Sequence, residues 1–129
     1  MLITHELEKY SLGITSTVAD ALKKIDENKL GLIFIVNQSN YLLGCFTDGD
    51  FRRNVITMGV IDTGTTTVAS MFNADCKALN ISTSRAELAM AFSERIKAVP
   101  LCDDAGHLVR VAISDQDGFF IGGTLISAS

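Results

Sequence analysis

Thr47 and Asp50 are the residues whose types and spacing could do chemistry. The apolar run that ends at Phe46 predicts a strand, and Thr47 stands where a helix would begin. A hydroxyl and a carboxylate would then face one cleft at the start of that helix. A carboxylate can accept hydrogen bonds from two adjacent hydroxyls, which is what the diol of a ribose presents. The pair could therefore hold the sugar of a nucleotide.

The same two residues also have a purely structural interpretation. Thr47 is a favourable N-cap, and Asp50 stands three positions later, as in a capping box. Acidic side chains also stabilise the positive end of a helix dipole. Because one threonine can cap a helix and bind a ligand, the two interpretations are compatible and both stay open.

Neighbouring residues could complete such a site. Leu32 and Ile33 lie in an apolar strand that could form a wall for a base and read its edge through backbone groups. A helix N-terminus attracts phosphate, although Asp48 and Asp50 partly cancel that attraction. The pair Arg52-Arg53 could restore it, or both arginines could be solvated surface residues.

Other kinds of reactive site lack their residues. Asp48 and Asp50, two positions apart on a helix, point to different sides and do not face one substrate. The chain has no P-loop and no dinucleotide fingerprint. Cys45, Cys76 and Cys102 show no CxxC spacing, and the apolar runs around Cys45 and Cys102 favour buried free thiols. With two histidines, a zinc site is not expected. We therefore expect no enzyme activity, no catalytic residues and no metal.

Two similar units must position these residues. The first half is predicted as a helix, a hairpin and a second helix, at 18–28, 30–36, 41–46 and 47–58. The second half repeats the order after a leading strand, at 77–81, 84–95, 96–102 and 108–113. Residues 58–73 form the connector. Each copy is too small to bury a good core alone, so the two should pack about a pseudo-two-fold axis.

A shift of 66 residues superposes the two halves without gaps. It places Asn40 on Gly106 (106 − 40), and both residue types tolerate positive φ in a turn. After Ser114 the repeat predicts a second closing helix. The segment 117–123 contains three glycines, each of which disfavours a helix by about 1 kcal/mol relative to alanine. The closing helix is therefore expected to be short, displaced or absent.

The second half offers a possible second site at Ser114 and Asp117. Their spacing matches that of the first-half pair, but Ser114 stands 67 residues after Thr47 (114 − 47). In the gap-free register the corresponding residues are Ile113 and Gln116. Unless a β-bulge near Arg110 restores the serine and aspartate, the second copy is degenerate. We expect a single strong site, in the first copy.

The repeat order and the segment 44–50 resemble the CBS domain signature. In that signature a glycine and two apolar residues lead into Thr or Ser, with Asp three positions later. The resemblance covers the chain to about Asp117. It implies an α/β (α+β) fold of two CBS β-α-β-β-α repeats, at 1–60 and 61–129, the second with an atypical Gly-rich tail. Within the family, 47–53 looks like CBS pairs associated with nucleotidyltransferases or sugar-phosphate isomerases.

The resemblance implies a regulatory module that binds an adenine nucleotide, AMP, ADP or ATP, in the cleft of the first repeat. S-adenosylmethionine is a less favoured ligand. Thr47 and Asp50 would contact the ribose and phosphate. The other expected site residues are Asp48 and Arg53 beside them and, around the base, Ile14, Thr15, Leu32 and Ile33. A ligand-free dimerisation scaffold and a regulatory fragment of a sugar-nucleotide transferase are the alternatives.

Charge and hydropathy limit the partners. The net charge is −4, and Arg52-Arg53 is the only tight basic pair, which argues against duplex nucleic acid. No stretch approaches the roughly 18 apolar residues of a membrane span, and residues 1–5 lack the pattern of a signal peptide. We therefore expect a cytoplasmic protein that needs no cofactor. The family resemblance adds a homodimer, and possibly an enzyme domain that the module regulates.

Overall fold

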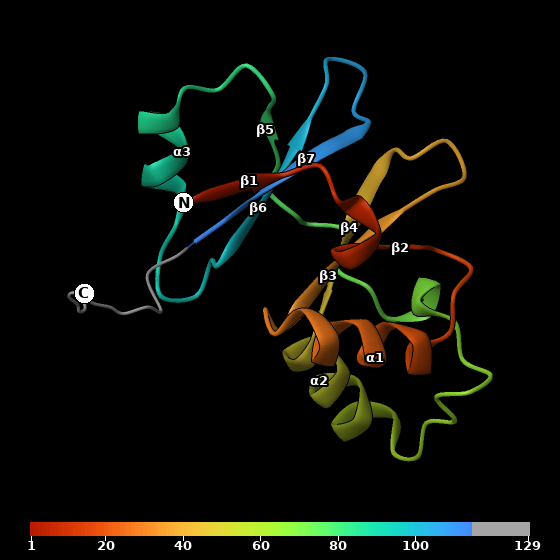
Figure 1. The fold of residues 1–129 in the computed structure, drawn as a ribbon. Helices are drawn as coiled ribbons and strands as arrows, with labels where there is room; N and C mark the ends of the chain where they lie inside the picture. Colours follow the sequence, from red (N-terminus) through yellow and green to blue (C-terminus); the bar gives the residue numbers. More distant parts are fainter. Residues whose placement is uncertain (115–129) are drawn as a thin grey trace.

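The protein is built on two small sheets whose helices lie on opposite sides (Figure 1). In the computed structural model, residues 1–114 are described. The first sheet has the order β2-β3-β4 and the second the order β1-β7-β6-β5. The strands are β1 Leu2–Thr4, β2 Ser11–Gly13, β3 Leu32–Val36, β4 Leu42–Thr47, β5 Leu79–Asn80, β6 Ala98–Cys102 and β7 Leu108–Ile113. The helices are η1 Leu7–Lys9, α1 Val18–Asn28, α2 Asp48–Met58, η2 Val68–Ser70 and α3 Arg85–Ala91.

The predicted α/β fold class is confirmed, and the first half follows its sequence signals closely. Helix α1 begins after Thr17, whose side-chain oxygen accepts the backbone N–H of Asp20 at 3.1 Å. It ends at Lys29, which takes the left-handed conformation with φ 64°. The predicted glycine-rich tail at 117–123 and its short or missing closing helix lie outside the described residues.

Strand alternation divides the apolar residues of β3 between two cores. Ile33 and Ile35 pack toward α1, in the core that α1 and η2 cover. Phe34 and Val36 point the other way and pack against residues of the second sheet. That central core also contains Ala98, Cys102, Leu108 and Val111. The two halves therefore share this central core, as the small size of each copy predicts.

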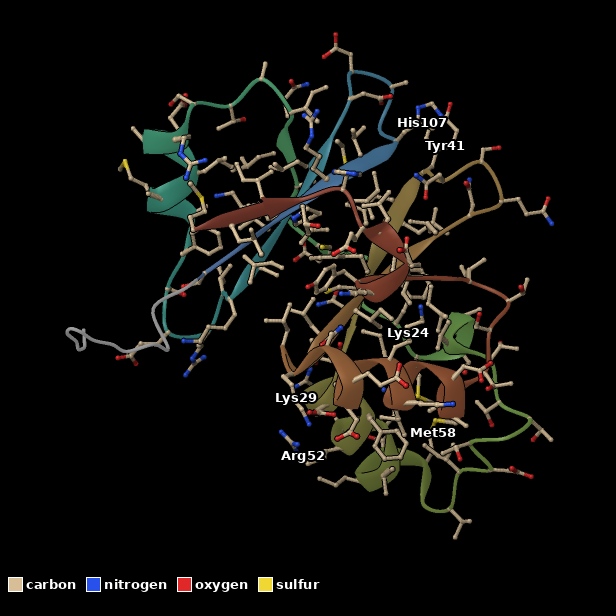
Figure 2. All side chains as sticks on the ribbon, viewed as in Figure 1. Lys24, Lys29, Tyr41, Arg52, Met58 and His107 are labelled. Atoms are coloured by element: carbon tan, nitrogen blue, oxygen red, sulfur yellow. The ribbon has the colours of Figure 1, made fainter. Side chains whose placement is uncertain are left out.

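The two hairpins meet about a pseudo-two-fold axis. The N–H of Leu42 donates to the carbonyl of Gly106 at 3.1 Å, and the N–H of Leu108 donates to the carbonyl of Asn40 at 2.9 Å. Each bond maps onto the other by the shift of 66. Tyr41 stacks on His107, its own counterpart, with ring centroids 4.2 Å apart (Figure 2). Asn40 and Gly106 both have positive φ, 67° and 99°. The predicted two-fold packing is confirmed.

The shift of 66 holds within the hairpins but fails in the elements before them. Val36 pairs with Leu42 as Cys102 pairs with Leu108, after an irregularity at the same place in each hairpin. By contrast, Ser84 caps α3 67 residues after Thr17 caps α1 (84 − 17). The gap-free superposition is therefore wrong for the leading strand and helix. One residue fewer separates the second helix cap from its hairpin.

Helix α3 is shorter than predicted. It ends at Ala91, because Phe92 has an extended conformation with ψ 150°, whereas the apolar spacing predicts a helix to about Arg95. The side-chain oxygen of Ser93 accepts the N–H groups of Arg95 and Ile96 at 3.2 and 3.1 Å. A serine that bonds nearby backbone groups competes with helical hydrogen bonding. The local turn replaces the last helical turn.

Two segments pack on the half of the molecule opposite to the predicted repeat that contains them. Strand β1 pairs antiparallel with β7, with Leu2 opposite Ile113, so the first residues of the chain complete the second sheet (Figure 1). The connector instead packs on the first half, where Val68 and Met71 are buried beside α1. No helix within residues 1–114 is long and apolar enough to span a bilayer.

Candidate functional site

A cavity of about 280 Å³ lies between the two halves. This volume is at the lower end of small-molecule pockets, which are about 300–1,000 Å³. Its walls are mainly apolar, and its polar side chains are Thr47, Asp75, Lys77 and Arg95. The apolar and thiol residues that line it include Leu32, Phe34 and Cys45 from the first half and Leu79, Ala98 and Pro100 from the second.

Thr47 brings a hydroxyl to this cavity while it caps helix α2. Its side-chain oxygen accepts the N–H of Asp50 at 3.0 Å, so the oxygen performs the capping role. A hydroxyl also carries a hydrogen that can donate, and no bond among residues 1–114 uses that hydrogen. Thr47 can therefore cap the helix and bind a ligand at the same time.

Asp50 is engaged inside the protein. It is 8% exposed, and its Oδ2 accepts the N–H of Thr47 at 3.0 Å, which completes the capping box. Its Oδ1 accepts a charge-assisted bond from Arg53 at 2.6 Å. Asp50 is not among the residues that line the cavity. The structural interpretation of Asp50 is thus confirmed, and its contact with a ribose stays a prediction.

The other expected site residues are separated from one another. Leu32 lines the cavity, but Ile33 points to the opposite face of β3 and is fully buried against α1. This corrects the expectation that the two residues form one wall, because successive side chains of a strand alternate in direction. Ile14 and Thr15 line a different surface depression, with 37–39.

The charged residues near the start of α2 also lie away from the cavity. Asp48 lines a surface depression with Asp26 and Lys29. Arg53 is largely exposed and holds Asp50, whereas Arg52 projects outward from α2 (Figure 2). Of the expected nucleotide residues, the structure brings only Thr47 and Leu32 together at the cavity.

Lys77 and Arg95 are the site residues that sequence reasoning missed. Both line the cavity and are exposed, and neither forms an ion pair with another residue of 1–114. With Asp75 as the one carboxylate of the lining, these two cations favour a ligand that carries negative charge. The signal that could have found Lys77 is its place at the start of the second repeat, which the two-fold axis brings beside Thr47.

Two thiols also line the cavity. Cys45 lies on β4, and Cys76 lies in the segment that leads into β5. The thiol of Cys76 donates a hydrogen bond to the sulfur of Cys45, which lowers the pKa of Cys45 and raises the pKa of Cys76. Cys102 is buried as expected, but Cys45 and Cys76 are only half-buried. The expectation of a buried thiol is therefore wrong for Cys45.

In the second half, Ile113 occupies the strand position that Thr47 occupies in the first. Ile113 stands opposite Ala98 as Thr47 stands opposite Leu32, so Ile113 takes the threonine position. The irregularity in this hairpin is at Leu101/Cys102, the counterpart of the one in the first half, and the pairing shows no further shift from there to Ile113. The N–H of Ser114 donates to the carbonyl of Lys97 at 2.8 Å. The other expected member of this site, Asp117, lies outside the described residues.

Comparison with known proteins finds a family match over part of the chain. Residues 8–57 match the family model of the CBS domain. Arabinose 5-phosphate isomerase GutQ from Escherichia coli K12 is 27% identical over 111 residues, which are 86% of this chain and 34% of the isomerase. The isomerase of the same name from Salmonella typhimurium is 28% identical over 109 residues, 84% of this chain and 33% of the isomerase. The chain spans about a third of the length of these relatives.

Solved structures share the fold. A CBS domain protein from Streptococcus pneumoniae TIGR4 superposes with a TM-score of 0.72 at 12% identity, covering 86% of this chain and 77% of that one. The cystathionine β-synthase pair domain of a putative Mg²⁺ transporter from Shewanella oneidensis gives 0.67 at 24% identity, covering 85% and 61%. CbpB in complex with c-di-AMP gives 0.68 at 10% identity, covering 80% and 69%.

Proposed function

From the match of residues 8–57 to the CBS domain, we propose that the chain is a regulatory module of the CBS type that binds an adenine nucleotide, such as AMP, ADP or ATP, in the cavity between its halves. The observation that carries the proposal is the meeting of Thr47, Lys77 and Arg95 at one apolar cavity. The two cations suit phosphate oxygens, and the apolar walls suit a base.

Apart from Thr47, the proposed contacts to the ligand's phosphates and base come from residues that the sequence does not point to. Thr47 donates its free hydroxyl hydrogen to the sugar or a phosphate, and Lys77 and Arg95 hold the phosphates. Phe34 on β3 and Pro100 on β6 line the cavity, and in the proposed complex they form the apolar wall beside the base. Asp50 then contributes by fixing Thr47. The complex of CbpB with c-di-AMP gives support from the same fold, because that ligand contains adenine.

Calorimetric titration with AMP, ADP, ATP and S-adenosylmethionine tests the proposal. We expect one of the three nucleotides to bind with one site per chain, and Lys77→Ala to weaken its binding about tenfold or more, as for a lost charge-assisted hydrogen bond. Arg52→Ala is the matched control, because Arg52 is exposed and lies away from the cavity. A flat trace with all four compounds would contradict the proposal.

A scaffold that dimerises without a ligand is the second candidate. Ile56 at 83% exposed and Val60 at 99% leave apolar surface on and just after α2. A homodimer through this surface would cover it. Sedimentation of the wild type and of Ile56→Lys measures this directly, and a monomer at micromolar concentration in both would exclude the scaffold.

The regulated partner is also part of the proposal. The relatives are isomerases about three times as long as this chain, so we infer that the module acts on a sugar-phosphate enzyme, covalently joined or separate.

The described residues bring together no group of three His, Cys, Asp or Glu side chains that could hold a metal. Turnover of arabinose 5-phosphate by the isolated chain would contradict a purely regulatory role.

A further inference from the structure

Cys45 and Cys76 form a pair of thiols on the wall of the cavity. We propose that this pair is a redox-sensitive modification site, which low-molecular-weight disulfides of the glutathione class convert reversibly into an intramolecular disulfide. The reaction would join β4 of the first half to the segment that enters the second half. This inference rests on the placement of the two cysteines and not on the nucleotide proposed above.

The backbone brings the two cysteines together. Cys45 and Asn73 form a bridge, in which the N–H of Cys45 donates to the carbonyl of Asn73 at 2.9 Å and the N–H of Asn73 donates to the carbonyl of Cys45 at 2.8 Å. The side chain of Asn73 then accepts the N–H of Asp75 at 2.9 Å, which turns the chain. Cys76 lies three residues after the bridge, where it lines the same cavity and packs against the same central core as Cys45.

The contact gives the two sulfurs different roles. The donated hydrogen bond stabilises the thiolate of Cys45 and lowers its pKa, against burial and the negative charge of Asp50, which both raise it. Cys45 is therefore the attacking thiolate. The pKa of Cys76 is raised, first by its bond to Cys45 and then by burial. Cys76 keeps its proton until Cys45 has reacted.

The exchange proceeds in two balanced steps. The thiolate of Cys45 attacks one sulfur of glutathione disulfide, forms a mixed disulfide and releases one glutathione thiolate. Cys45 then carries no charge, so the anion that held the proton of Cys76 is gone. Cys76 gives its proton to the released thiolate and attacks the Cys45 sulfur, which releases the second glutathione. The protein loses two electrons and two protons, and one glutathione disulfide becomes two glutathione thiols.

Cys102 is the internal control. It is buried, does not line this cavity, and its pKa is raised, mainly by burial. A thiol of that kind reacts slowly with disulfides. Of the three cysteines in the chain, Cys102 should therefore stay reduced while the other two are oxidised.

The experiment uses the full chain, reduced and then exposed to glutathione disulfide at neutral pH. Titratable thiols should fall from three to one, with a mass lower by two hydrogen atoms and no retained glutathione. Peptide mapping should find Cys45 linked to Cys76, and dithiothreitol should restore all three thiols. Cys102→Ser should leave the link unchanged.

Single variants test the order of the two steps. Cys76→Ser should stop at a stable glutathione adduct on Cys45, whereas Cys45→Ser should lose most of the reaction. Circular dichroism of each variant establishes that it folds. A stable adduct on the folded wild type, a link from Cys76 to Cys102, or oxidation that occurs only in denaturant would each overturn the proposal.

Discussion

Gly44 shows how a motif residue can be fixed by packing alone. A methyl group added to its Cα would lie 2.1 Å from the carbonyl oxygen of Asn73 and 2.9 Å from a ring carbon of Phe72. The backbone of Asn73 cannot move freely, because Asn73 and Cys45 exchange two backbone hydrogen bonds. The packed ring of Phe72 cannot move freely either. The glycine therefore lets the connector lie on β4. In the second half, the corresponding Arg110 is exposed.

Gly44→Ala is predicted to lower the free energy of unfolding by about 1–3 kcal/mol or more, as forced overpacking does. Gly13→Ala is the matched control, because nothing lies within 4 Å of its added methyl group and its φ is not positive. Urea unfolding of the three proteins measures the difference. Equal loss in both variants would show that the contact with the connector does not decide the cost, because the lower entropy of the unfolded chain favours both alanine variants.

Asp50 is predicted to contribute mainly to the stability of the fold. Asp50→Ala removes the acceptor for the N–H of Thr47 and the partner of Arg53, so the free energy of unfolding should fall by about 1–2 kcal/mol, as for a lost cap. Asp48→Ala, which removes an exposed carboxylate from the same turn, should cost about 0.5 kcal/mol or less. Thermal or urea unfolding gives these values.

The same variants decide the role of Asp50 in binding. If Asp50→Ala unfolds more easily but binds the nucleotide as tightly as the wild type, the ribose contact predicted from the sequence is excluded. If affinity falls much more than stability explains, Arg53 must release the carboxylate in the complex. Sequence alone could not separate these cases, because a capping box and a ribose contact need the same spacing of Thr47 and Asp50.

At the scale of elements, the two hairpin turns solve one problem with different chemistry. In the first turn, the side-chain oxygen of Asn37 accepts the N–H groups of Ser39 and Tyr41 at 2.9 and 3.0 Å. In the second, Asp103 accepts the N–H groups of Ala105 and His107 at 3.0 and 2.9 Å. The second turn therefore carries a charge that the first does not.

The charge on Asp103 predicts that the stability of the fold depends on pH. The backbone N–H of His107 is the largest cause that holds the pKa of Asp103 below its usual value, and the imidazole 3.0 Å away adds to it. Because the folded pKa is lowered, this stabilisation is present above the unfolded value of about 3.9 and is lost as pH falls through the folded pKa. Asp103→Asn copies the first turn, so it should preserve the fold.

Urea midpoints at pH 6 and pH 3 measure the effect. We expect the wild type to lose more stability than Asp103→Asn between these two values, with the two proteins closer to each other at pH 3. Parallel losses would mean that the carboxylate of Asp103 contributes nothing to acid sensitivity.

The helices and strands also differ in how well the sequence predicts them. The hairpins, α1 and α2 follow directly from apolar spacing, turn residues and caps. Helix α3 does not, because Ser93 bonds the N–H groups of Arg95 and Ile96 in place of a last helical turn. A gap-free superposition of the two halves cannot show the one-residue difference before the second hairpin. Lys77 and Arg95 were missed since only the packing of the halves brings them to Thr47.

At the scale of the molecule, β1 links the two ends of the described chain. Ile3 packs in the core of the second half, with Leu88 and Val99, whereas Leu2 is 58% exposed on the same strand. Ile3→Asp should therefore lower the free energy of unfolding by about 2 kcal/mol, and Leu2→Asp should have little effect.

Hydrogen exchange locates the consequence of Ile3→Asp. Amides of β6 and β7 should lose protection, while those of α1 and β3 keep theirs, because β1 belongs to the second sheet. Loss of protection confined to the first half would contradict this assignment of β1.

The pairing of β1 with β7 also sets an order of folding. Leu2 meets Ile113, so this contact closes a loop of almost the whole described chain, and such distant contacts form late. The first half can fold before this contact forms, because β2 is the leading strand of the first sheet. During synthesis, β1 would emerge before β7 and remain an unpaired strand edge until β7 had been made. Folding of the second half should therefore limit the rate, with β1 as the segment exposed to mispairing in the meantime.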